Sequence, residues 1–322
     1  MKKEKAKITK AQRAWFSREM FLLGMETALE WGFINQDLRR FTEFVVARNA
    51  VRIAREAGKR EYWSPDPILR NFHFCNISRE NDRVTRWIAA NWREPHQADP
   101  DLWFASVLAR RCINLPDTLT EIGYPVPWNP DHYLEVTKQR TRRGKQRFNS
   151  RAYRLTLNDQ SGDLPERQVK FLLNPLWAAR DKFRPHSKDT LDTFHARLAA
   201  VPLMGGFYTG QVVADLKYVG PLRNAPDWWD FAVSGPGSRR GLSRAMGLDL
   251  GSSWPDDDWA RILHPMRHAI APKLSKAGLP KMHAQDMEHC LWEFDRYERI
   301  RLGEGKGRKF VPNPEALPSV KD

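Results

Sequence analysis

Long apolar runs are missing from this sequence. No stretch approaches the roughly 18 consecutive apolar residues that a membrane-spanning helix needs. The first residues, MKKEKAKITKAQRAWF, include a basic stretch but lack the apolar segment that follows it in a signal peptide. We therefore expect a cytoplasmic protein that has no membrane partner.

Cysteine is also scarce. Cys75, Cys112 and Cys290 lie far apart and are odd in number, which argues against a disulfide framework and against a CxxC metal knuckle. His264 and His268 have the i, i+4 spacing of zinc-binding helices, but a proline lies between them and the glutamate of an HExxH motif is missing. We expect reduced thiols and no metal site.

Acidic residues are outnumbered by basic ones. The 322 residues include 53 Lys and Arg against 39 Asp and Glu, which gives a formal net charge of +14. Such an excess favours a polyanionic partner, and nucleic acid is the first candidate. A hydrophobic content of 41%, with 11% aromatic residues, is sufficient for a folded core in one large or two modest domains.

Strand character is confined to one region, and the dominant period is helical. Helices are expected at 11–31, 37–57, 78–92, 100–112, 131–143, 188–200, 207–218 and 282–301. AYRLTL, residues 152–157, faces QVKFLL, residues 168–173, across a polar stretch and predicts a β-hairpin, although two helix ends would give a similar pattern. The predicted fold is mainly α with this small β-hairpin insertion. Residues 1–302 would form one helical domain, as a single body or as two lobes with the active site between them, and 303–322 a mobile tail.

The segment SGPGSRRG, residues 234–241, looks like a glycine loop, and its flanks decide what it binds. A GxGxxG dinucleotide loop needs a preceding strand and a glycine at position 240, where the chain has Arg240. Pro226 and Asp227 instead have the character of first-turn helix residues, so the segment predicts a helix, a hairpin and a second helix. This resembles the helix-hairpin-helix of base-excision DNA glycosylases, whose hairpin has a Pro-Gly core.

A hairpin of that kind contacts the DNA backbone. Gly235 and Gly237 would allow close approach of the backbones, and the amides around Ser238, at the start of the second helix, would point at a phosphate oxygen. Arg239 and Arg240 would add positive charge there. The alternative is an ordinary turn between helices with a solvated basic face.

Two further patches are rich in arginine. NFHFCNISRENDRVTRWI, residues 71–88, carries charged residues one helical turn apart, which are expected to share a face with Asn76 beside them: Arg79, Asp82, Arg83 and Arg86. The alternative is a ladder of ion pairs on a solvated helix. KQRTRRGKQRFNSR, residues 138–151, offers cations for DNA phosphates, namely Arg142, Arg143, Lys145 and Arg147, with Tyr153 placed to stack on DNA. The alternative is a disordered basic loop, which would still add nonspecific affinity.

Four segments together resemble one family. They are FHFCNISRENDRVTRWI at 72–88, FNSRAYRLT at 148–156, SGPGSRRGL at 234–242 and QDMEHCLWEFDRYERIRLGEGKGR at 285–308. The family is the alpha-glutamyl/putrescinyl thymine pyrophosphorylases, or amino acid:DNA transferases, which is related to the helical domain of 5-hydroxymethyluracil DNA kinases. The resemblance extends over most of the chain from about residue 60 to 308.

This resemblance implies an enzyme of phage-type DNA hypermodification with a glycosylase-like helical fold. A separate hydroxymethyluracil DNA kinase would activate 5-hydroxymethyluracil in double-stranded DNA. The transferase would replace its phosphate or pyrophosphate with an amino acid or a polyamine, with no further cofactor. The location would be a phage-infected host cell or the bacterial cytosol, and the target base would be flipped out of the duplex.

Roles for particular residues follow from this chemistry. Arg79 and Arg83 are suited to the charge that develops on the departing pyrophosphate, with Asp82 and Asn76 beside them. The incoming amine needs a base, for which Glu293 is the first choice.

Asp286 is the second choice for the base, on the same helical face as Glu293. The alternative for this helix is that its apolar residues simply pack while its charges pair in water.

Two other functions stay open. The first is a base-excision glycosylase, but only Asp256, Asp257 and Asp258 lie about 20 residues after the hairpin, in an acidic turn led by proline. The second is a noncatalytic DNA-binding subunit that serves a separate kinase. The segment GEGKGRK, residues 303–309, is not a P-loop, because it lacks GxxxxGK[ST] and a preceding strand, so kinase activity is not expected.

Overall fold

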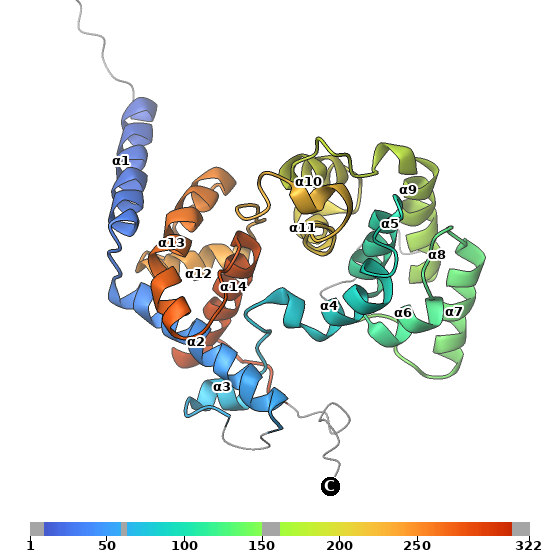
Figure 1. Cartoon of the computed structure of the whole chain (residues 1–322), viewed down its shortest axis with the longest axis horizontal. Coiled ribbons are helices and arrows are strands. Elements are labelled where there is room, and N and C mark those ends of the chain that lie inside the picture. The colour runs from blue at the N-terminus through green and yellow to red at the C-terminus, as the bar shows by residue number, and fades with distance from the viewer. Residues whose placement is uncertain (1–9, 59–62, 150–161, 311–322) are drawn as a thin grey trace, which may run out of the picture. The chain divides into compact units, whose positions relative to one another are not determined.

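A computed structural model describes residues 10–58, 63–149 and 162–310, with the side chains of the first helix described from residue 15 onward. The chain divides into two compact units (Figure 1). Unit 1 comprises residues 1–77 and 234–322, and unit 2 comprises residues 78–233. The described parts of both are mainly helical, and no β-strand occurs in them. None of the described helices is long and apolar enough to span a membrane.

Unit 1 is built from helices of both ends of the chain. They are α1 (Lys10–Glu30), α2 (Gln36–Glu56), α3 (Pro67–Asn71), α12 (Pro236–Met246), α13 (Asp256–Lys276) and α14 (Ala284–Arg301). Helix α2 begins where the Asn35 side chain accepts a hydrogen bond from the amide of Leu38, which is a typical N-cap. Phe41 and Phe44 of α2 pack against Phe294 of α14 with ring centroids 5.3 and 5.7 Å apart. This aromatic contact forms part of the core of the unit.

Glycines on α12 allow it to lie very close to α14. A Cβ atom on Gly241 would lie 2.0 Å from the backbone oxygen of Leu291, and one on Gly237 would lie 1.9 Å from the ring of Trp292. Only a residue without a side chain fits at such a distance. Gly237 is therefore explained by packing inside unit 1.

We expect Gly241→Ala to lower the free energy of unfolding by about 2–3 kcal/mol or more, because the backbone of α14 cannot move away as a flexible side chain would. Gly24→Ala is the matched control, since a Cβ there meets nothing within 4 Å and the helix gains stability by about 0.5–1 kcal/mol. Urea denaturation of both variants measures the difference. Equal stability of the two variants would contradict the close packing of α12 on α14.

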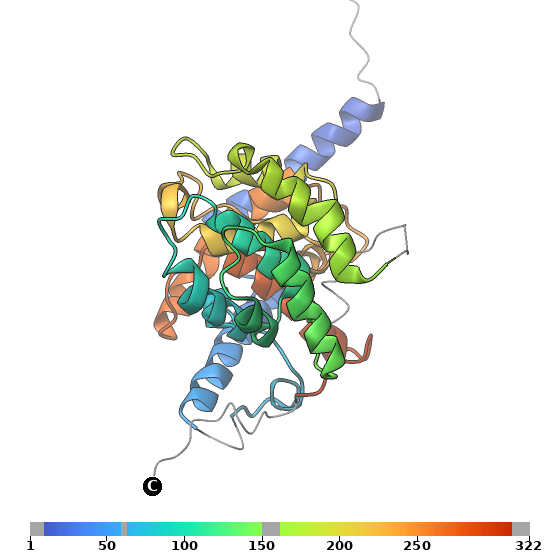
Figure 2. The same ribbon diagram turned by 90° about the vertical axis from the view of Figure 1, so that its right-hand side faces the viewer.

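Unit 2 consists of shorter helices, coloured from teal to gold in Figures 1 and 2. They are η1 (Arg79–Asn81), α4 (Arg83–Ile88), η2 (Ala89–Arg93), α5 (Leu102–Val107), η3 (Leu108–Ile113), α6 (Pro116–Ile122), α7 (Pro130–Arg142), α8 (Leu164–Gln168), η5 (Val169–Leu173), α9 (Asn174–Ala178), η6 (Arg180–Lys182), α10 (Leu191–Ala199), α11 (Gly205–Leu216) and η7 (Gly220–Asn224). Trp103, Phe104, Tyr133 and Phe194 are completely buried in its core. The helix of α5 continues into η3 as a π-helical segment, a rare form that is frequent at functional sites.

The structure shows that the predicted β-hairpin is wrong. Its second arm, residues 168–173, belongs to a helix that begins at Leu164, and Val169, Leu172 and Leu173 are buried on one side of it. A short apolar run looks the same in a buried helix and a buried strand, so its periodicity could not distinguish them. The first arm, residues 152–157, lies outside the described residues.

The helix predicted before the 234–241 hairpin is also absent. Residues 226–230 form a turn, and the carboxylate of Asp227 accepts hydrogen bonds from the amides of Leu191 and Asp192 at 2.8 and 2.9 Å. Asp227 thus caps the start of α10 and starts no helix of its own. This turn, which belongs to unit 2, stands where the first helix of the predicted helix-hairpin-helix was expected, and α12 belongs to unit 1.

Residues 256–258 also differ from their prediction as an acidic turn. They form the first turn of α13, where negative charge is favourable because the helix dipole is positive at that end. Pro265 and Pro272 inside this helix had obscured its periodicity. In the predicted tail, Phe310 donates from its amide to the backbone oxygen of Asn71. Residues 311–322 lie outside the described part.

Candidate functional site

Arg79 lies at the start of η1 and points into unit 2. Its Nη2 donates to Oδ1 of Asp215 and to the backbone oxygen of Gln211, each at 3.1 Å. Its side chain is 12% exposed, and that of Asp215 is 1% exposed. The cation that the sequence assigned to a leaving group is therefore already paired with a buried carboxylate.

A second arginine binds the same carboxylate. Nε and Nη2 of Arg110, on η3, donate to the two oxygens of Asp215 at 2.6 Å each, and Nη2 also donates to Thr85 at 2.9 Å. Burial alone would raise the pKa of Asp215, but Arg110 and Arg79 together hold it below its usual value. Two guanidinium groups on one ionised carboxylate leave this cluster with a net positive charge.

The remaining residues of the first arginine-rich patch do not share one helical face. Asp82 has an extended backbone and separates η1 from α4, so the regular spacing from Arg79 is interrupted. Arg83 is 73% exposed, and its nearest carboxylate is that of Asp117 at 3.7 Å. Asn76 belongs to unit 1, where its Oδ1 accepts from Nη2 of Arg48 at 2.9 Å.

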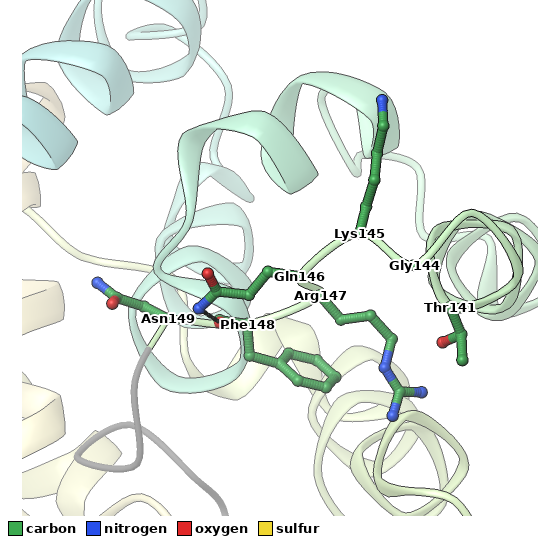
Figure 3. Close-up of a pocket in the computed structure, with 7 residues that line it drawn as sticks. All are labelled: Thr141, Gly144, Lys145, Gln146, Arg147, Phe148 and Asn149. Atoms are coloured by element: carbon green, nitrogen blue, oxygen red, sulfur yellow. Dashed lines mark hydrogen bonds between the residues drawn. The ribbon is translucent and has the colours of Figure 1, made fainter. Parts of the chain in front are cut away.

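The second basic patch follows α7 and borders a cavity of about 320 Å³ (Figure 3). The cavity is lined by Thr141, Gly144, Lys145, Gln146, Arg147, Phe148 and Asn149. Figure 3 shows the side chains of Arg147 and Phe148 pointing to the same side, away from that of Lys145. The exposed Arg143 pairs with Glu121 at 2.5 Å, and Arg147 pairs with Asp163 at 2.5 Å.

Of the four cations that the sequence predicts for DNA phosphates here, Arg142 and Lys145 form no ion pair with any described residue, and both are exposed. Both are therefore available for phosphate groups, whereas Arg143 and Arg147 already have carboxylate partners. Tyr153, predicted to stack on DNA, lies outside the described residues.

The start of α12 carries the residues predicted for the DNA hairpin. Gly235 is the N-cap, and its amide donates to the hydroxyl of the completely buried Ser238 at 2.9 Å. Arg239 pairs with Asp256 at 2.5 Å, and Arg240 pairs with Asp295 at 2.8 Å. Both arginines thus have partners within unit 1.

Gly235 is different from the other glycine of this hairpin. Its φ of −133° is accessible to any residue, and a Cβ atom there would meet nothing within 4 Å. Packing within unit 1 therefore does not explain Gly235, whereas it does explain Gly237.

The two candidate bases lie on α14 and are buried. Both oxygens of Glu293 accept from Nη1 of Arg296 at 2.9 and 2.8 Å, and the residue is 2% exposed. Asp286 is 6% exposed, and its carboxylate lies 3.3 Å from Nε2 of His283.

His73 is a further titratable group near Glu293 that the sequence analysis did not select. Burial lowers the pKa of His73, and the nearby negative charge of Glu293 opposes that shift. The imidazole is therefore neutral at pH 7 and able to accept a proton. In the sequence, His73 could have been selected because it lies inside FHFCN, the start of one of the four segments that carry the family resemblance.

Arg110 and Asp215 were also missed. The signal for Arg110 was a pair of arginines inside the apolar run LWFASVLARRCI, where an unpaired charge is unfavourable. The sequence could not identify its partner, because Asp215 lies 105 residues away.

Comparison with known proteins gives two matches. The family model for the helical domain of 5-hmdU DNA kinases matches residues 35–307. A 5-hmdU DNA kinase of Bacillus phage SP10 is 25% identical over 61% of this chain and 33% of its own length. The chain therefore spans about a third of the curated relative that it matches. No solved structure matches it.

Proposed function

The chain belongs to the family of the helical domain of 5-hmdU DNA kinases, and we propose that it takes part in modifying 5-hydroxymethyluracil in DNA. More specifically, it would replace the phosphate or pyrophosphate of activated 5-hydroxymethyluracil with an amine or amino acid. A hydroxymethyluracil DNA kinase would supply the activated base. The base would leave the duplex stack to react, as in other enzymes that act on DNA bases.

The proposed reaction balances without a further reagent. The amine nitrogen forms a bond to the 5-methylene carbon, and the bond from that carbon to the oxygen of the leaving group breaks. The electron pair departs with pyrophosphate, and a base accepts the proton that the amine loses. The protein must therefore supply positive charge for the leaving group and one proton acceptor.

One observation carries this proposal beyond the family match: the excess of guanidinium groups around Asp215. Arg79 and Arg110 share this single carboxylate. A preorganised positive cluster of this kind is suited to charge that develops on departing phosphate oxygens. Arg83, exposed at the start of α4, would contact the departing phosphate from the solvent side.

The decisive experiment supplies duplex DNA that carries pyrophosphorylated 5-hydroxymethyluracil together with a panel of amines and amino acids. We expect release of pyrophosphate and a nucleoside heavier than thymidine by the attached amine, detected by mass spectrometry. The variant Arg79→Gln should lose activity while unmodified DNA is still bound. Formation of abasic sites without an adduct would overturn the transferase and support a glycosylase.

A noncatalytic role as the DNA-binding partner of a kinase is the second candidate. The specific observation in its favour is that Glu293 and Asp286 are both buried and bonded to neighbours. In that case the same assay would yield neither pyrophosphate nor an adduct, while DNA binding would persist.

DNA binding itself should depend steeply on salt. The logarithm of the affinity should fall with the logarithm of the salt concentration by about 0.9 for each phosphate neutralised. Arg142→Gln and Lys145→Gln should each reduce this slope by about one, and Lys182→Gln, an exposed cation outside the patch, should leave it unchanged. Fluorescence anisotropy with a labelled duplex measures all three, and equal slopes would exclude the patch from the interface.

A further inference from the structure

Arg111 is a buried cation without an acidic partner in the described structure. It lies on the π-helical segment η3 of unit 2 and is 5% exposed. None of the ion pairs among the described residues includes it, whereas the adjacent Arg110 pairs with Asp215. A buried charge without a counter-charge is costly, so such a group is rarely retained without a reason.

The hydrogen bonds of Arg111 are also incomplete. Its Nε donates to the backbone oxygen of Leu203 at 2.7 Å, and its guanidinium carbon lies 4.1 Å from the centre of the Tyr208 ring. Its Nη1 is buried and has no hydrogen-bond partner in the described structure. Burial lowers the pKa of Arg111, and no carboxylate is among the groups that oppose this shift, which are the phenol of Tyr208 and the thiol of Cys112, whose own pKa is raised by burial.

The guanidinium lies beside the first turn of α11. Leu203 precedes this helix, and Tyr208 belongs to its first turns. Arg111 therefore contacts residues on both sides of the N-terminus of α11. No side chain caps this end, where the N-cap is Met204. The first amides of a helix carry partial positive charge, which makes a neighbouring cation unfavourable and a neighbouring anion favourable.

Gly205 and Gly206 place no side chains on the first turn of α11, and the space that a Cβ atom would occupy is free at both. Gly206 has an ordinary backbone conformation, and a Cβ atom on it would meet its nearest neighbour, in His195, at 3.9 Å. The fold therefore does not require glycine at position 206. Leu203, just before the turn, has a φ of +74°, which is strained for a leucine.

We propose that Arg111 and the first turn of α11 form a binding site for a phosphate oxyanion. The anion would supply the missing counter-charge, accept from Nη1 of Arg111 and accept from the uncapped amides around Gly206. The phosphate is either a free or terminal one, as in pyrophosphate, or one of the DNA backbone. The site requires neither an amine nor an activated base, so its failure would leave the transferase proposal standing.

The test uses the full chain, inorganic pyrophosphate and an unmodified DNA duplex. Wild-type protein should gain thermal stability with pyrophosphate or bind the duplex through this site. Arg111→Met should keep or raise the melting temperature in buffer, because it removes an uncompensated buried charge. The same variant should lower the affinity for the phosphate ligand about 10- to 100-fold. Lys188→Met removes an exposed charge of unit 2 and should change neither property.

A second variant keeps the test decisive if Arg111→Met does not fold. Gly206→Asp places a carboxylate at the first turn, which should stabilise the helix through its dipole and occupy the place of the ligand. Loss of the pyrophosphate response alone would assign a free or terminal phosphate. Loss of DNA affinity alone, with a salt slope lower by about one, would assign the DNA backbone. Unchanged binding of both probes in the folded variants would overturn the site.

Discussion

Asp215→Asn is expected to lower the free energy of unfolding by about 3–5 kcal/mol, the largest loss for any exchange of a single charged group that we predict in unit 2. The wild-type carboxylate is completely buried and accepts from Arg110 at 2.6 Å and from Arg79 at 3.1 Å. An asparagine of the same size leaves two guanidinium groups facing each other without a counter-charge. Chemical denaturation of the variant and the wild type measures the difference.

The same exchange should change the dependence of stability on pH. The pKa of Asp215 is lowered in the folded protein, so its contribution is present above the unfolded value of about 4 and is lost as the pH falls through the lower folded value. The variant should therefore lose less stability than the wild type below about pH 4.

Asp131→Asn is the matched control for Asp215→Asn. Asp131 is exposed in the first turn of α7, where its removal should cost less than about 1 kcal/mol. Similar losses for the two variants would show that Arg79 and Arg110 do not depend on Asp215.

Glu293→Gln should slow the proposed amine transfer by about 10²- to 10⁴-fold, the usual contribution of a general base, with DNA binding retained. Glutamine keeps the shape of the side chain but cannot accept the proton of the amine. Single-turnover rates with activated DNA and saturating amine measure this effect, and anisotropy with unmodified DNA measures binding.

If Glu293 only supports the fold, Glu293→Gln would also slow the reaction by damaging the structure. The variant Arg296→Gln distinguishes this case from a role of Glu293 as the base. This variant breaks the same ion pair, in which Nη1 of Arg296 lies 2.8 Å from the carboxylate, but it leaves the base in place. We expect its rate to fall much less than that of Glu293→Gln at a similar loss of stability. Equal rates for the two variants would remove Glu293 from the reaction and direct attention to Asp286 or the neutral His73.

Most helices of this protein could be predicted from the sequence because their signals are local. The segments expected at 11–31, 37–57 and 131–143 correspond to α1, α2 and α7 within one residue at each end. Amphipathic periodicity repeats within α2 and α7, and Asn35 and Asn129 cap these two helices through their own side chains. The excess of basic residues is likewise a property of composition alone.

Other elements depended on neighbours that the sequence does not identify. QVKFLL at 168–173 is helical because Leu172 and Leu173 find a buried environment in unit 2, and its pattern alone also fits a strand. Gly237 is predicted to contact DNA from its sequence context, and the structure adds a neighbour that the sequence does not identify, because Trp292 of α14 occupies the space of a side chain there.

Only the tertiary structure decided which charges are available to a ligand. Asp215 lies 105 residues from Arg110 and 136 residues from Arg79, and it pairs with both. Arg111, next to Arg110 in the sequence, meets no carboxylate within the described units, and its environment is the start of α11. Adjacent residues on a π-helical segment point in different directions, so two neighbouring arginines have different environments: Arg110 shares a carboxylate with Arg79, and Arg111 has no counter-charge in the described units.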